Sequence, residues 1–254
     1  MFAPAHLRVV RRDRAILAAA VCGLALVAWL SLWAAQASPW GRFLQHDAQA
    51  SGSIVVQAVL FTAGWTLMIV AMMLPTSIPL IVTFGALVGR RPHPGRLVAL
   101  LVAGYLAAWT GFGLAVWLAD RGVHALVDAW PLLAEHPQLI LATTLLVAGL
   151  WQFSPLRERC LDECRSPLGF LVGRWRGTEP RREAVRMGVA HGVFCIGCCW
   201  SLMLVLFGVG MGSLVLMLGL GALTAIERNM PWGRRLTRPL GAVLVVAGVA
   251  ALTP

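Results

Sequence analysis

The chain has 254 residues, of which 59% are hydrophobic and 13% carry a charge. A soluble domain carries about 25% charged residues, so this composition excludes an ordinary soluble protein and predicts an all-α, polytopic transmembrane helical bundle. The formal net charge is +10, but the basic residues are all arginines in short segments between apolar runs, which excludes a nucleic-acid-binding role.

About seven apolar runs are expected to cross the membrane, and the first of them follows a basic head. That run exceeds the 7–15 apolar residues of a usual signal core, so we expect an uncleaved anchor rather than a signal peptide. A polar loop over 36–53 separates it from the second run. In chain order the predicted spans cover 16–35, 55–88, 97–119, 139–153, 187–207, 213–226 and 239–254.

The second predicted span is unusually long and contains Pro75 and Pro79. Proline removes a backbone hydrogen bond and kinks a helix. In lipid such a break persists only where side chains or neighbouring helices satisfy the freed carbonyls. Thr76 and Ser77 are the nearest candidates for that task, so a kink is expected here.

The distribution of arginine predicts the orientation of the chain. Only Arg42 and Arg121 fall in segments expected to face outside, whereas the other arginines lie in 1–15, 89–96 and 154–186 and in the turn 227–238. The positive-inside rule then places the N-terminus in the cytoplasm, in a single integral membrane domain over 1–254 with a cytoplasmic loop at 154–186. The segment 120–138 is expected to hold a short amphipathic piece at the interface.

The fifth predicted span carries one histidine and three cysteines within nine positions: His191, Cys195, Cys198 and Cys199. Because residues on a helix advance about 100° each, Met187, His191, Cys195 and Cys198 form one stripe with Cys199 at its edge. His191 and Cys198 are about 10 Å apart along the axis, whereas metal–ligand bonds are about 2.0–2.3 Å. We therefore expect two neighbouring metal sites, or a ladder that shares Cys195.

A second cysteine pair, Cys160 and Cys164, lies in the predicted cytoplasmic loop with i, i+4 spacing. We expect it near the inner end of the fifth span, where it would complete a four-ligand site with His191 and Cys195 or hand the metal over. Three arginines flank the pair and are expected to favour thiolates over thiols: Arg157, Arg159 and Arg165.

Methionines on the second span form a third group of candidate ligands. Met68, Met72 and Pro75 share one helix face, whereas Met73 points elsewhere, and Met72 is expected at a depth comparable to that of Cys198. His, Cys and Met together select soft metals, above all Cu(I). Zinc is the competing metal, although it does not use thioether ligands.

Three other residues are expected to serve packing or to mark the end of a span, and not to bind metal. Cys22 stands alone in the first span and is interpreted as a small buried hydrophobe. Glu227 is expected to end the sixth span, and Arg228 to belong to the cytoplasmic turn that follows.

Two strings of sequence identify a resemblance. WTLMIVAMMLPT at 65–76, which contains MMLPT, and HGVFCIGCCWSLM at 191–203, which contains the pattern HGxxCxGCC, resemble a bacterial family of predicted metal-binding integral membrane proteins. The stretch from Cys160 to Phe170 resembles that family's intervening loop, and the likeness covers about 55–230. The resemblance implies a multi-span membrane protein that binds metal, and it implies no particular activity.

These patterns favour a multi-pass protein of the bacterial inner membrane that binds or transfers a soft metal ion, copper(I) first and zinc second. A binding role is favoured over an enzymatic one. The expected partners are the lipid bilayer and a metal chaperone or another membrane subunit, with no nucleic acid. The candidate ligands are His191, Cys195, Cys198, Cys199, Cys160, Cys164 and Met72.

Two alternatives remain open at this point. Cys195 and Cys198 form a C-x-x-C that would serve a membrane thiol–disulfide oxidoreductase, although the βαβ context of thioredoxin-type motifs is absent from the sequence. The other alternative is a structural subunit of a membrane complex in which the metal acts as a staple.

Overall fold

The computed structural model describes residues 3–36, 38, 53–209 and 213–252, without the side chains of 3–11 and 207–209. Every regular element within these ranges is helical, which confirms the predicted all-α class. Most of the predicted polar loop at 36–53, with Arg42, lies outside the described residues.

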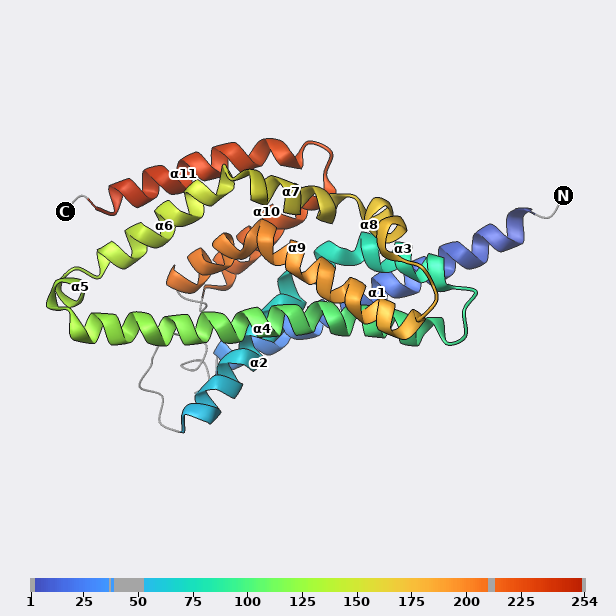
Figure 1. Ribbon diagram of the computed structural model, residues 1–254, viewed down its shortest axis with the longest axis horizontal. Coiled ribbons are helices and arrows are strands. Elements are labelled where there is room, and N and C mark those ends of the chain that lie inside the picture. The colour runs from blue at the N-terminus through green and yellow to red at the C-terminus, as the bar shows by residue number, and fades with distance from the viewer. Residues whose placement is uncertain (1–2, 37, 39–52, 210–212, 253–254) are drawn as a thin grey trace.

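The elements follow one another as α1 (Ala3–Gln36), α2 (Ile54–Met72), η2 (Pro75–Ser77), α3 (Ile78–Val88), α4 (Pro94–Ala129), α5 (Pro131–Glu135), α6 (Gln138–Gln152), α7 (Pro155–Arg165), α8 (Pro167–Arg174), α9 (Pro180–Val209), α10 (Leu214–Asn229), η3 (Gly233–Leu236) and α11 (Thr237–Ala250). The long helices α4 and α9 run side by side through the middle of the molecule, and α6 lies along α11 (Figure 1). Helix α7 bridges from α6 onto α9, so a segment expected to be a loop reaches the central helix pair.

Among the described residues, four helices are long and apolar enough to cross a membrane: Arg12–Gln36, Ile54–Met72, Pro94–Ala129 and Pro180–Leu206. Helices α6 and α7 make a fifth crossing if they count as one span, which bends by 64° between them. The other apolar helices fall short of the roughly 20 residues that a straight crossing needs, since α10 has 16 residues and α11 has 14. The expectation of seven crossings is therefore not confirmed.

The predicted break in the second span is present between α2 and α3. Pro75 has no N–H to offer the carbonyl of Ala71, and that carbonyl instead accepts a hydrogen bond of 3.1 Å from Trp29 Nε1 on α1. Thr76 Oγ1 donates to the Met73 carbonyl at 2.7 Å. The break is thus satisfied by one neighbouring helix and one local hydroxyl, as a kink in an apolar bundle requires.

Small residues bring α4 and α9 unusually close together. A Cβ atom at Gly188 of α9 would collide with the carbonyl of Leu101, and one at Gly104 of α4 would collide with the carbonyl of Val185. Glycine at such positions lets two helix backbones approach closely. This approach brings the aromatic face of α4 against the cysteine-bearing part of α9.

Two predicted connections are helical instead. Helix α4 continues to Ala129, through about half of the segment 120–138 that was expected to hold a short amphipathic piece, and α5 follows within the same segment. The charged loop at 154–186 contains α7 and α8, and the hydroxyl of Ser154 accepts from the backbone N–H of Leu156 at the start of α7. Burial explains why these helices form, because α7 and α8 insert Leu161 and Phe170 into the core.

Cys22 is exposed on α1, so its interpretation as a buried hydrophobe is wrong. The buried stripe of this helix is instead Val21, Ala25, Ala28 and Leu32. These positions follow the 3–4 spacing of one helix face, and Cys22 lies about 100° away from it.

Candidate metal centre

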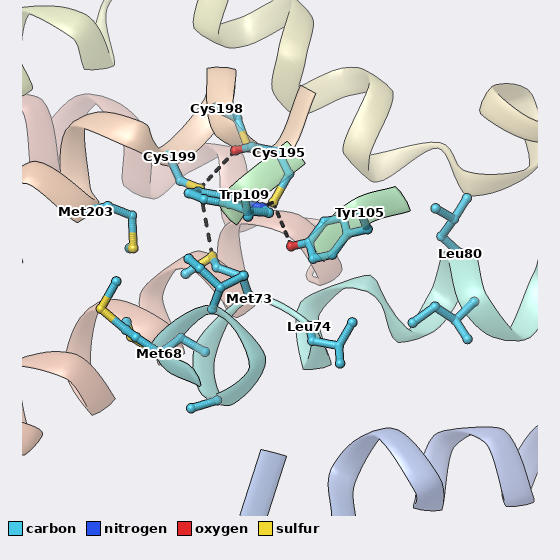
Figure 2. Packing of buried hydrophobic residues seen from close by; sticks show 14 of the residues in the cluster. Met68, Met73, Leu74, Leu80, Tyr105, Trp109, Cys195, Cys198, Cys199 and Met203 are labelled. Atoms are coloured by element: carbon cyan, nitrogen blue, oxygen red, sulfur yellow. Dashed lines mark hydrogen bonds between the residues drawn. The ribbon is translucent and has the colours of Figure 1, made fainter. Parts of the chain in front are cut away.

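The three cysteines of α9 all point into the bundle. Cys195, Cys198 and Cys199 are 0%, 2% and 1% exposed, respectively. The thiols of Cys198 and Cys199 lie 3.2 and 2.9 Å from the carbonyl oxygen of Cys195, to which each is placed to donate. One helical turn thus gathers three sulfur atoms on the buried side of α9 (Figure 2).

A buried arginine from α10 lies at the centre of this cluster. Nη2 of Arg228 is 2.8 Å from Cys195 Sγ, 2.9 Å from Cys198 Sγ and 3.5 Å from Cys199 Sγ. Its other terminal nitrogen donates to Thr76 Oγ1 at 2.8 Å. The guanidinium is only 5% exposed, so it links α9, α10 and the broken second span in the interior.

The sulfur of Cys195 lies among polar groups from three directions. Trp109 Nε1 donates to it at 3.3 Å, and the Tyr105 hydroxyl lies 3.0 Å away. Indole and guanidinium groups only donate hydrogen bonds, so this sulfur accepts from both Trp109 and Arg228. A charged donor strengthens such a bond when the acceptor is ionised, and the site is therefore suited to a thiolate.

The two cysteines of α7 lie against the part of α9 that carries Gly197 and Cys198, which is deeper along that helix than the inner end where they were expected. Cys160 Sγ occupies the space beside Gly197, where a larger residue on α9 would collide with it. The thiols of Cys164 and Cys198 interact directly. Helix α7 thus extends the sulfur cluster from three cysteines to five.

His191 lies on the same helix but belongs to a different set of neighbours. Its Nε2 is 3.2 Å from Ser77 Oγ, and its ring stacks obliquely on Tyr105 and edge-on against Phe170. Within the described residues, the buried Nδ1 of His191 has no hydrogen-bond partner. The imidazole therefore has a buried nitrogen without a partner among the described residues, on the helix that also carries the three cysteines.

The thioether in contact with the cluster is that of Met73. Its Sδ lies 3.8 Å from Cys199 Sγ, and Figure 2 shows Met68 and Met203 on the same side. Met72 instead lies against Gly221 of α10. Met73 keeps an αR backbone and its N–H donates to the Ile69 carbonyl, so its side chain leaves α2 about 100° away from that of Met72. The side of α2 that meets the thiols is therefore that of Met73 and not that of Met72.

The functional positions of Glu227 and Arg228 were not predicted from the sequence. Glu227 does not simply end a span: its carboxylate forms a buried ion pair of 2.7 Å with Arg157, which also donates to Thr237 Oγ1 at 3.1 Å. Arg165 donates to backbone carbonyls of Glu227 and Met230. These two arginines therefore contact α10 and its end rather than the thiols, and Arg228 is the cation beside the sulfurs. An adjacent acid and base at the end of an apolar run were the available signal, since such charges are usually paired.

The donor set matches a soft monovalent ion better than a hard one. Three thiols and a thioether meet at one buried place, and soft sulfur ligands select Cu(I) over metals that prefer oxygen. In the part of the chain that is described, no three His, Cys, Asp or Glu side chains already surround a common point at metal-binding geometry. Nη2 of Arg228 occupies the point on which the sulfurs converge.

Residues 62–251 match the PpoB2 copper chaperone family. This match covers most of the chain, so the protein belongs to that family. The match is consistent with a metal-binding protein and supports a role in copper handling. Comparisons with curated proteins and with solved structures give no significant match.

Proposed function

We propose that this member of the copper chaperone family holds Cu(I) as cargo in the thiol cluster of α9. The ligands are Cys195, Cys198 and Cys199, with the thioether of Met73 beside them. The main support for the proposal is that three buried sulfurs lie around Arg228 Nη2, at 2.8, 2.9 and 3.5 Å from it. Copper is favoured over zinc because zinc does not use the thioether ligand that this site offers.

Cys160 and Cys164 form the handover pair in this proposal. The contact between Cys164 and Cys198 lets one sulfur of each helix share an ion while it moves between them. Ligand exchange between neighbouring thiolates needs no free ion in the apolar interior, where an unpaired charge is costly. His191, whose Nδ1 has no partner among the described residues, provides the second metal-binding position in this proposal. Met72 is left out because it contacts Gly221.

The setting of this chemistry is a bacterial inner membrane, with the N-terminus in the cytoplasm. The four long apolar helices and the arginine distribution support a multi-pass arrangement. We keep the whole chain as one domain and seven crossings as the working topology, in which α10 and α11 would be the short spans. A soluble metal chaperone or another membrane subunit is the expected partner for copper exchange.

Copper binding by purified protein tests the proposal. The detergent-solubilised protein is titrated with Cu(I) in competition with bicinchoninate, next to a variant in which Cys195, Cys198 and Cys199 are all replaced by serine. Wild type should retain stoichiometric copper and the triple variant should lose it. A Cys22→Ser variant is the matched control, because Cys22 is exposed on α1 and far along the chain from the cluster.

Equal copper retention by wild type and the triple variant would refute the proposal. Elemental analysis of protein purified without added metal should find copper, and stoichiometric zinc in its place would reject the choice of metal. Thiol mapping under oxidising and reducing conditions addresses the oxidoreductase alternative. A reversible disulfide between Cys195 and Cys198 would favour thiol–disulfide exchange over copper handling.

A further inference from the structure

The point where an ion would bind in the α9 cluster is taken by a positive charge of the protein itself. Arg228 Nη2 lies 2.8 and 2.9 Å from the sulfurs of Cys195 and Cys198. A metal bound to thiolate lies about 2.3 Å from the sulfur. The guanidinium nitrogen therefore sits near the position of a shared ion, only about half an ångström too far from each sulfur. Ion and nitrogen exclude each other there.

We propose that Arg228 is a displaceable counter-cation, which neutralises the thiolate cluster when no copper is bound and is expelled from it when Cu(I) arrives. This inference rests on the proposed function, because it concerns the same thiols. It assigns to Arg228 a positioning role rather than that of a ligand. Its physical basis is that buried thiolates without a cation are costly, so one positive charge is exchanged for another.

The exchange balances without any redox step. Copper arrives as Cu(I) on a thiolate of its carrier, Cu–S bonds form to cysteines of α9, and the bond from copper to the carrier sulfur breaks. A proton held by an α9 thiol passes to the released carrier thiolate, and copper stays Cu(I). The hydrogen bonds from the guanidinium to the sulfurs and to the Cys195 carbonyl, the latter 3.2 Å long, are lost at the same time.

The displacement is transmitted to α7 because the neighbouring residue ties the two helices together. Arg228 is preceded by Glu227, which pairs with Arg157 on α7 at 2.7 Å. Arg165 on the same helix donates to the Glu227 carbonyl. A shift at the end of α10 therefore changes the support of the helix that carries Cys164. Loading of the α9 thiols would in this way be coupled to the position of the handover pair.

Hydrogen–deuterium exchange of the purified protein, with and without Cu(I) supplied as its bicinchoninate complex, tests this inference. Metal binding usually protects a protein. Here, copper should instead raise amide exchange in 224–230 by about fivefold or more, because several hydrogen bonds that hold the last turn of α10 are broken. In Arg228→Met this exchange should be fast already without copper, and copper should change it little. Competition with bicinchoninate measures the copper occupancy of the variant in parallel, so that the exchange data refer to copper-loaded protein.

Arg234→Met is the matched control. Arg234 pairs with Asp162 of α7 near the same helix end but is about half exposed, so the copper response of this variant should equal that of wild type. Slower or unchanged exchange in 224–230 on copper loading of wild type would overturn the inference, as would loss of copper binding in both Arg228→Met and Arg228→Lys. If the copper titration shows that wild type binds no copper through the α9 thiols, both the proposed function and this inference are refuted. If wild type binds copper there but exchange in 224–230 does not rise, only this inference is refuted.

Discussion

Replacing Arg157 by methionine should be among the most destabilising changes in the chain that leave every copper ligand in place. Arg157 is fully buried, and its guanidinium joins α7 to the end of α10 by the 2.7 Å ion pair with Glu227 and to Thr237 by a hydrogen bond. Methionine fills much of the same volume but cannot donate. The carboxylate of Glu227, itself 2% exposed, would keep only the hydrogen bond from Thr237 Oγ1 at 3.0 Å.

The expected magnitude follows from the charge that is left behind. Breaking a buried ion pair by removing one partner costs about 3–5 kcal/mol, because the remaining charge is desolvated without compensation. Replacing both partners is much less costly. The double variant Arg157→Met, Glu227→Leu should therefore recover about 2–4 kcal/mol of the loss of the single variant. For a chain of this length, the single variant should lower Tm by roughly 6–20 °C.

Denaturation of the detergent-purified, copper-free protein measures these free energies, with far-UV circular dichroism as the signal. Arg182→Met is a suitable control, because Arg182 and Glu179 form an exposed pair that should contribute no more than about 1 kcal/mol. A single Arg157→Met variant within about 0.5 kcal/mol of wild type would show that the buried ion pair contributes little to stability. A double variant less stable than the single one would show that the unpaired carboxylate is not the cause of the loss.

Three further predictions concern the helix contacts and the thioether. Gly188→Ala should destabilise by about 1–3 kcal/mol, since the added methyl group meets the backbone of Leu101; Gly122→Ala, with open space around it, should not destabilise in the same thermal assay. Trp29→Phe should lower the free energy of unfolding by about 1 kcal/mol in a denaturant titration, because the carbonyl of Ala71 loses its donor. An unchanged free energy of unfolding would mean that Trp29 does not stabilise the kink. Met73→Leu should weaken Cu(I) binding in competition titrations by about tenfold, whereas Met72→Leu should leave it unchanged; the reverse order would return the thioether role to Met72.

The helical period and the residue types were enough to find the sulfur side of the candidate site. Three cysteines spaced by three and four residues must share one side of a helix, and a long apolar helix cannot turn such a side to lipid at low cost. The positive-inside topology predicted that Cys160 and Cys164 would lie near the inner end of the fifth span, but it did not predict that their segment is a helix packed on α9. The central cation was not predictable in this way. Arg228 is 30 residues from Cys198 and lies next to a turn rich in arginine. The adjacent Glu227 marks it as a candidate buried charge, but nothing local indicates that its partners are the thiols of α9.

Local patterns in the chain are enough to predict its apolar character, its helical class, the position of the proline break and the sulfur stripe of α9. All of these depend on local chemistry and on the geometry of a single helix, which neighbouring residues set. The packing of helices against one another is what places α7 on α9, Met73 rather than Met72 at the thiols, and Arg228 among them. Those outcomes depend on which helices approach one another, and the free energy of burying a charge is settled by partners that are remote in the chain.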